Sequence, residues 1–190
     1  MANYSGLVPV DISSFSAFAN EIIGNAYDVD GLFGYQCVDL PKLLTGNAGR
    51  SLPYWKSGNS GYAREGWTDT TSREYNKGNL FTLVYNKEDV RVGDVVILDQ
   101  TNTNPYGHVA FATTDWNANT TYAILLGQNQ EHASASQGYK TTLTNVNVTT
   151  FLGAFRFIAW QPTPPTPTVV TRKGSFKWVL YARKIRNQHK

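Results

Sequence analysis

The feature that most constrains the fold is a change of hydrophobic period near residue 80. Before it, apolar residues recur at helical spacing over residues 12–23 and 38–45. After it come six short segments rich in β-branched and aromatic residues, separated by turn residues. These segments are residues 80–85, 94–98, 108–113, 122–126, 140–143 and 151–160. Helices first and strands later predict an α+β domain, with N-terminal helices packed on a six-stranded antiparallel sheet.

A boundary follows the last predicted strand at about residue 160. Residues 161–170 are rich in Pro and Thr, which predicts an extended, fairly stiff linker. Residues 161–190 hold seven Lys/Arg and no acidic residue, whereas all 14 Asp and Glu precede them. We therefore expect one folded domain over residues 1–160, a linker, and a basic tail over residues 171–190.

No apolar run approaches the ~20 residues that a membrane span needs. The first nine residues lack the basic and apolar stretches of a signal peptide. We expect a protein made in the cytoplasm without a signal peptide, which something else must release if it works outside.

The chain has one cysteine, Cys37, so an intramolecular disulfide is excluded. Cys37 lies just before the predicted helix over residues 38–45. A helix N-terminus and a neighbouring imidazole both stabilise a thiolate, which is the nucleophilic form. The alternative is a small, buried apolar side chain without chemistry.

A base for such a nucleophile must come from three histidines. His189 lies in the basic tail and His132 in a polar stretch, whereas His108 opens an apolar strand that would hold it rigidly. Asn129 ends the next strand, and an antiparallel neighbour would place it beside His108, where it could fix the imidazole tautomer. The alternatives are a structural histidine and an ordinary turn residue.

An acidic stretch precedes the cysteine. Asp28, Asp30 and Asp39 occupy positions 1, 3 and 12 of a twelve-residue window, with Leu32 and Gly34 at positions 5 and 7. Three carboxylates with backbone carbonyls form an oxygen cage suited to calcium. The alternative is an Asp-rich turn that caps helices. We favour the cation, because carboxylates crowded into one turn need a counter-charge.

The segment Asp28-x-Asp30-Gly31-x-x-Gly34-x-Gln36-Cys37-x-Asp39 resembles the nucleophile segment of the CHAP family, the cysteine, histidine-dependent amidohydrolases/peptidases. Three later features agree with it in order and spacing. They are Val92-Gly93-Asp94-Val95-Val96, Gly107-His108-Val109-Ala110 and Gln128-Asn129. The resemblance covers about residues 12–160 and is greatest to the phage endolysin branch.

This resemblance implies a papain-like fold and cysteine-dependent cleavage of an amide bond in Gram-positive peptidoglycan, by an N-acetylmuramoyl-L-alanine amidase or an endopeptidase. It makes Cys37 the nucleophile, His108 the base, Asn129 the polar third member and Gln36 an oxyanion donor. It also makes the five residues of the acidic window calcium ligands, with Leu32 and Gly34 acting through their carbonyls. An endolysin would be made in the host cytoplasm and reach the wall after holin-dependent release, or act from the virion.

Two positions depart from the family pattern. Gly127 stands where the family often has Glu or Asp, so Asn129 would orient His108 alone, or Glu131 would substitute. Gly34 has no side chain where some relatives use His. The first departure is the best support for an alternative function, that of a catalytically inactive wall-binding or virion structural protein. A cytoplasmic papain-like protease acting on proteins is a third reading, which the acidic domain, basic tail and calcium loop disfavour.

The basic tail has two readings. It is either a solvated terminus or the start of a truncated cell-wall-binding module, whose charge would attract anionic wall polymers. Nucleic-acid binding is not expected, because no folded basic face accompanies the tail. The sequence leaves a partner subunit open.

Overall fold

The computed structural model describes residues 2–130 and 139–162. Its helices are α1 (Phe15–Ile22), α2 (Asp39–Asn47), α3 (Glu65–Thr68) and α4 (Thr70–Lys77), with 3-10 turns at Lys87–Asp89 and Ile158–Trp160. Its strands are β1 (Asn3–Ser5), β2 (Ala26–Asp28), β3 (Phe81–Val84), β4 (Val95–Leu98), β5 (His108–Ala112), β6 (Tyr122–Gly127), β7 (Thr142–Asn147) and β8 (Phe151–Phe157).

Six of the strands form one antiparallel sheet in the order β3-β8-β4-β5-β6-β7. The predicted α+β, papain-like architecture is therefore confirmed, and each of the six strands overlaps a predicted segment. β7 begins two residues later and ends four residues later than predicted, and residues 158–160 form a 3-10 turn instead of the end of a strand. A small parallel pair, β1 with β2, was not predicted. Three-residue strands are too short to show a period of two.

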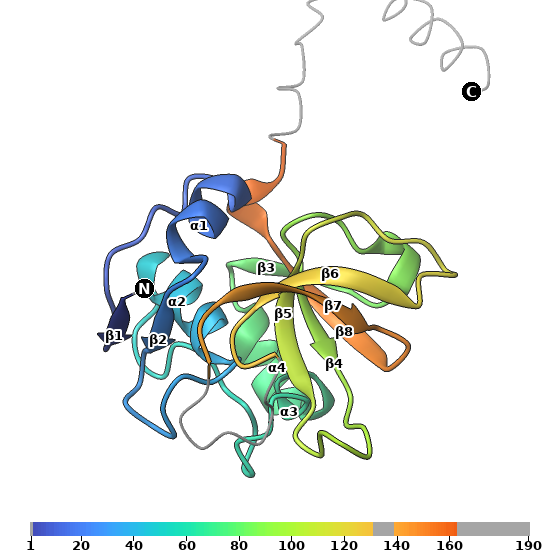
Figure 1. The fold of residues 1–190 in the computed structure, drawn as a ribbon, viewed down its shortest axis with the longest axis horizontal. Coiled ribbons are helices and arrows are strands. Elements are labelled where there is room, and N and C mark those ends of the chain that lie inside the picture. Colours follow the sequence, from blue (N-terminus) through green and yellow to red (C-terminus); the bar gives the residue numbers. More distant parts are fainter. Residues whose placement is uncertain (1, 131–138, 163–190) are drawn as a thin grey trace, which may run out of the picture.

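The helices cover one face of the sheet, as Figure 1 shows for α1 and α2. Successive residues of a strand point to opposite faces, and here both faces are buried. Val95 and Ile97 of β4 pack in the cluster that holds Phe18 of α1 and Leu43 of α2. The alternate residues of β4 and β5 pack in a second cluster around Trp116. Burial on both faces explains why these central strands are almost wholly apolar.

The C-terminal end of the described residues packs against the N-terminal helix α1. Trp160, at the end of the last 3-10 turn, stacks edge-on against Phe15 with ring centroids 5.6 Å apart. Its indole Nε1 donates a hydrogen bond to the carbonyl of Ile12 at 3.0 Å. Residue 160 thus packs on the domain, while most of the expected linker and the whole basic tail lie outside the described residues.

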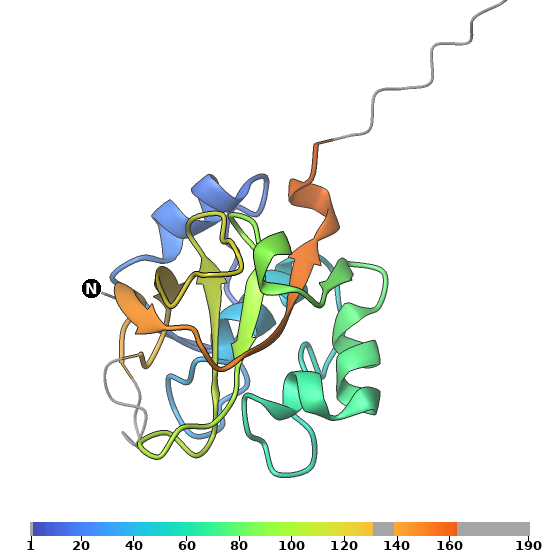
Figure 2. The ribbon, with the colours of Figure 1, turned by 90° about the vertical axis from the view of Figure 1, so that its right-hand side faces the viewer.

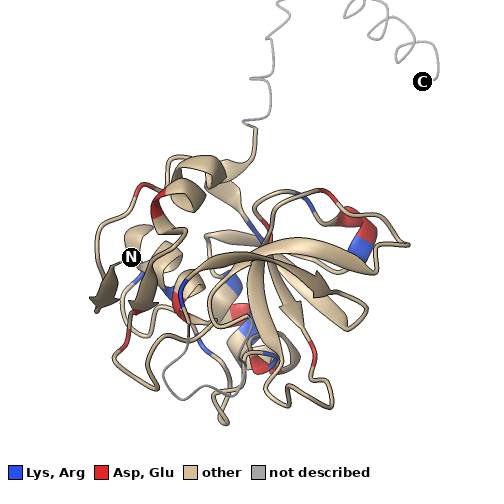
Figure 3. Ribbon diagram, viewed as in Figure 1, with Lys and Arg blue, Asp and Glu red and all other residues tan. Residues whose placement is uncertain are grey.

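Charges of both signs are interspersed over the described chain (Figure 3). The excess of basic residues found in the sequence belongs to the tail, so it does not mark a face of the described domain. Among the described residues, no helix is long and apolar enough to cross a membrane.

The α3–α4 pair lies apart from α1, with α2 between them (Figure 2). Trp67 of α3 anchors this pair, because its indole lies directly on the backbone of Gly153 in β8. A Cβ at Gly153 would lie 2.0 Å from Cζ2 of Trp67. Trp67 also packs edge-on against Phe155, with centroids 5.3 Å apart. Gly153 is therefore needed for close approach of the helix, not for its own backbone conformation.

We predict that Gly153→Ala destabilises the fold by about 2 kcal/mol, because the added methyl must displace a buried indole. Thr82→Ala, at an exposed position of β3, is the control and should change stability by less than ~0.5 kcal/mol. Urea denaturation of the two variants measures the difference. Equal midpoints for Gly153→Ala and the unaltered protein would contradict this packing.

Candidate active site

The loop between β2 and α2 is shaped by one buried carboxylate. Asp39, in the first turn of α2, has no exposed surface. Its Oδ1 accepts the backbone N–H of Val29 at 3.1 Å and its Oδ2 accepts that of Gln36 at 2.8 Å. Between these points, Gly31, Phe33 and Gly34 adopt positive φ. The carboxylate therefore closes the loop and delivers residue 37 to the start of the helix.

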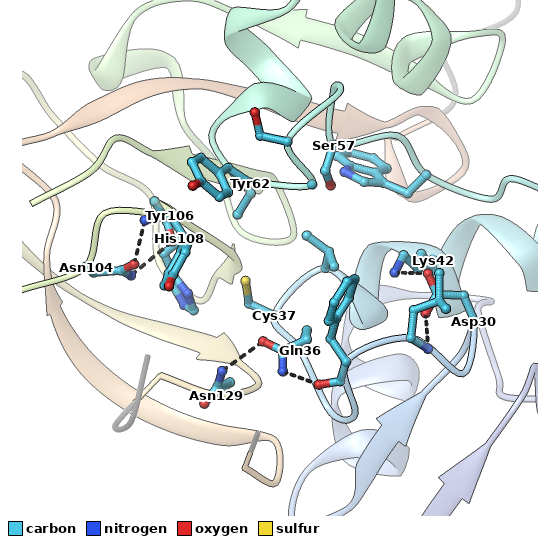
Figure 4. Close-up of a pocket in the computed structure, with 18 residues that line it drawn as sticks. Asp30, Gln36, Cys37, Lys42, Ser57, Tyr62, Asn104, Tyr106, His108 and Asn129 are labelled. Atoms are coloured by element: carbon cyan, nitrogen blue, oxygen red, sulfur yellow. Dashed lines mark hydrogen bonds and ion pairs between the residues drawn. The ribbon is translucent and has the colours of Figure 1, made fainter. Parts of the chain in front are cut away.

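Cys37 is partly buried and lies two residues before α2, as predicted. It lines a cavity of about 600 Å³ together with His108. Of the groups that lower the pKa of the thiol, the backbone N–H of Val109, the residue after His108, has the largest effect. Figure 4 shows the sulfur and the imidazole on neighbouring segments, with Tyr62 and Ser57 across the cavity. Two residues 71 positions apart in the sequence therefore meet in one cleft.

Burial controls the protonation of both groups. Desolvation raises the pKa of the Cys37 thiol to about 11, against the smaller lowering effect of the Val109 hydrogen bond. Desolvation also lowers the pKa of His108 to about 4, and the hydrogen bond to Gln130 offsets part of this. Both groups are then neutral at pH 7. Burial thus disfavours the charged form of each group, in opposition to the thiolate expected at the helix N-terminus.

Asn129 lines the same cavity as His108, but its hydrogen bond goes to Gln36 and not to the imidazole. Its Nδ2 donates to Oε1 of Gln36 at 3.1 Å, and its Oδ1 is buried without a hydrogen-bond partner. Asn129 has a positive φ of 56°, and its side chain points toward the loop between β2 and α2 that contains Gln36. The paired residues of β5 and β6 are Phe111 with Leu126 and Ala112 with Leu125, and β6 ends at Gly127, two residues before Asn129.

The side chain that reaches the imidazole is Gln130, which sequence reasoning missed. Its Oε1 lies 3.4 Å from Nε2 of His108. A polar residue just past the end of β6 was the only sequence signal, and it did not distinguish Gln130 from its neighbours. The proposed substitute Glu131 and the rejected base His132 lie outside the described residues.

Gln36 lies at the cavity with its side-chain amide held on both sides. Its Nε2 donates to the carbonyl of Phe33 at 2.7 Å, and its Oε1 accepts from Asn129. One amide N–H of Gln36 is not used by these two hydrogen bonds. The assignment of Gln36 as an oxyanion donor stays a prediction.

The three acidic residues of the predicted calcium window meet in space. Asp28, Asp30 and Asp39 each offer an oxygen within 4.8 Å of the others. Lys42 supplies one positive charge, with Nζ 2.6 Å from Asp30 Oδ2 and 3.4 Å from Asp39 Oδ1. Oδ1 of Asp28 is buried without a hydrogen-bond partner. Three carboxylates against one ammonium, with an unpartnered buried oxygen, fit a divalent cation.

Burial raises the pKa of Asp39 to about 7, although Lys42 and two backbone N–H groups favour its ionised form. A cation at this cluster would add to that effect and keep the carboxylate charged. Leu32 and Gly34 lie in the same loop, and the side chain of Leu32 is exposed at the cavity. Their assignment as carbonyl ligands stays a prediction.

An α+β sheet with a cysteine before a helix and a histidine opening a central strand, both facing one cleft, defines the papain-like class. Residues 25–129 match the family model described as the CHAP domain. The chain therefore belongs to the CHAP domain family.

The chain is 32% identical over 130 residues to the D-alanyl-L-alanine endopeptidase of Streptococcus phage B30, covering 66% of this chain and 26% of that protein. It is 29% identical over 157 residues to Endolysin PlyTW of Staphylococcus phage Twort, covering 82% and 31%. The solved structure of wild-type endolysin LysIME-EF1 matches with a TM-score of 0.53 at 22% identity, covering 78% of this chain and 64% of that one, and supports the fold. The chain spans between about a quarter and a third of the two phage relatives.

We predict that the imidazole of His108 titrates near pH 4, well below the usual pKa of a histidine, because burial disfavours its cation. NMR of protein with isotope-labelled histidine measures the midpoint, and the spectrum of His108→Ala assigns the signal. The other two histidines are the internal comparison. A midpoint at or above about 6.5 would show that His108 is not desolvated as described.

Proposed function

We propose that this chain hydrolyses an amide bond of bacterial peptidoglycan, with Cys37 as nucleophile and His108 as base. The observation that carries the proposal is the placement of Cys37 and His108 in one cleft. Membership of the CHAP family and homology to two phage proteins, one named an endopeptidase and the other an endolysin, support it.

Because both groups are neutral, the reaction begins with a proton transfer. Nε2 of His108 faces Gln130, so Nδ1 remains for the thiol. Nδ1 takes the proton of Cys37 as the sulfur attacks the carbonyl carbon of the substrate. The C=O electron pair moves onto oxygen, and the backbone N–H of Cys37 and the unused N–H of Gln36 stabilise this oxyanion.

The second half of the reaction releases two products. The imidazolium of His108 protonates the leaving amine as the C–N bond breaks, which leaves a thioester on Cys37. Water then attacks the thioester while Nδ1 accepts its proton. Collapse of this second intermediate returns the proton to sulfur and frees a carboxylic acid. One water is consumed, and both side chains return to their neutral state.

The cleft suits an extended substrate with a polar reacting centre. Phe33, with 81% of its surface exposed, lies on one rim. Tyr62 and Tyr106 stack edge-on on the other, with centroids 5.1 Å apart. Aromatic rims pack against peptide and sugar faces while leaving the polar centre free.

We further propose that calcium binds Asp28, Asp30 and Asp39, with the carbonyls of Leu32 and Gly34. The ion would supply structural order, because its ligands belong to the loop that delivers Cys37. It takes no part in proton transfer. Lys42 holds part of the same charge in the calcium-free protein and must move aside from Asp30 when the ion binds.

The wider biology is also a proposal. The domain would end near residue 160 and be followed by a linker and a basic tail that binds anionic wall polymers. The protein would be made in a phage-infected cell and reach the wall after release by a holin or from the virion.

We predict that Cys37→Ala folds with an unchanged melting temperature but releases no fragments from purified Gram-positive walls. Ser16→Ala, an equally small change on an exposed residue of α1, should digest walls normally. Mass spectrometry of the products identifies the bond: a freed lactyl end of muramic acid means an amidase, and a new peptide amine means an endopeptidase. Full digestion by Cys37→Ala would refute the mechanism, and no digestion by the unaltered protein would favour the inactive, wall-binding alternative.

We predict that chelator-treated protein binds calcium in a calorimetric titration and that its melting temperature rises. Asp28→Asn should weaken binding at least ~10-fold, because a ligand charge is lost. Lys42→Met should strengthen it, because a competing positive charge is removed. Asp115→Asn, on an exposed loop, is the matched control. If the unaltered protein shows no heat of binding and no rise in melting temperature with calcium, the calcium proposal is excluded.

A further inference from the structure

The carboxamide of Gln130 is held in one orientation by the sheet. Its Nε2 lies within hydrogen-bonding distance of three backbone carbonyls, those of Leu125 at 3.1 Å, Gly127 at 3.3 Å and Thr142 at 2.9 Å. Carbonyls only accept, so the NH₂ group must face them. The carbonyl oxygen of the side chain then points the other way, to Nε2 of His108 at 3.4 Å. The acceptor role of Oε1 is therefore determined by its surroundings.

Gly127 provides the space that this side chain occupies. The pairing of Phe111 with Leu126 puts Gly127 opposite Ala110, on the face of the sheet that also carries His108. A Cβ at Gly127 would lie 2.7 Å from Cδ and 2.8 Å from Oε1 of Gln130, and 3.0 Å from Cβ of Ala110. The φ of Gly127 is not left-handed, so its backbone does not require glycine. Its missing side chain is instead matched to the carboxamide.

The turn after β6 brings the two together. Asn129 adopts a φ of 56°, which reverses the chain immediately after the strand. The side chain of residue 130 thereby folds back over Gly127 instead of continuing away from the sheet. This path explains why the group that contacts the imidazole lies three residues beyond the glycine whose space it fills.

We propose that Gln130 is the positioning residue of His108: it accepts the Nε2–H hydrogen bond and so keeps Nδ1 free for the thiol of Cys37. The inference rests on the proposed function only in naming His108 as the base. A hydrogen bond to one ring nitrogen sets which nitrogen carries the proton. The 3.4 Å distance is long, as such bonds often are before substrate binds.

A neutral amide differs from a carboxylate in this role. It orients the ring and selects the tautomer, but it adds no negative charge to stabilise the imidazolium. The burial of His108, which disfavours its cation, agrees with that arrangement. The protein thus combines a buried imidazole, that of His108, with an uncharged orienting group, the amide of Gln130.

The first test measures the tautomer of His108 without substrate, by nitrogen-15 NMR of histidine-labelled protein above pH 6. We expect the Nε2–H form in the unaltered protein and in Gln100→Met, an exposed control. Gln130→Met, similar in length but without an acceptor, should give a mixture of tautomers and lower kcat by roughly 10- to 100-fold with little change in KM. An unchanged tautomer in folded Gln130→Met would overturn the proposal.

The second test moves the acceptor. Gly127→Glu alone should destabilise the protein, because the new side chain meets the carboxamide of Gln130. Gly127→Glu combined with Gln130→Ala opens that space, and the carboxylate should restore a single tautomer. Its charge should also raise the pKa of His108 by at least about one unit. The acid limb of the pH–rate profile should move to higher pH by the same amount. A double variant that folds but recovers neither the tautomer nor the pKa shift would also overturn the proposal.

These readouts separate two kinds of failure. The tautomer and the pKa of His108 are measured without substrate, so they judge the role of Gln130 alone. Wall digestion by Cys37→Ala judges the hydrolase proposal. If Gln130→Met does not fold, the double variant still decides the matter, because it restores an acceptor from a different position.

Discussion

The side chain of Gln128 joins the two halves of the site. It is fully buried at the end of β6, where its Oε1 accepts the backbone N–H of Tyr27 at 2.8 Å. Its Nε2 donates to the carbonyls of Tyr27 at 2.7 Å and Gln36 at 3.0 Å. A buried amide with satisfied donors and acceptor resists displacement, because each lost hydrogen bond leaves an unpaired polar group. These hydrogen bonds of Gln128 set the distance between the sheet and the loop that joins β2 to α2.

On either side of that connection, the structure uses fixed polar groups. Asp39 closes the nucleophile loop from the helix side through two backbone N–H groups. Gln130 holds His108 from the sheet side through three backbone carbonyls. Burial of Cys37 and His108 disfavours the charged form of each side chain. In the proposed reaction, fixed backbone dipoles therefore matter more than an ion pair between Cys37 and His108.

Much of the architecture was readable from the chain. The six strands and α1 and α2 follow from hydrophobic period and turn residues, since each pattern reports local burial. The positions of Cys37 before α2 and of His108 opening β5 follow from the same patterns. The acidic window was also visible, because its members lie within twelve residues of one another. Contacts across the fold were less accessible, as the unexpected partner of Asn129 illustrates.

By itself, the sequence determined which residue types are available and which local elements present them, because propensity, period and capping act over a few neighbours. Only the tertiary structure decided the protonation of Cys37 and His108, since desolvation depends on what packs around them. It also decided that Gln130 and not Asn129 meets the imidazole, because that choice depends on one left-handed residue and on the space above Gly127. Such contacts join residues distant in the chain, and no local pattern encodes them.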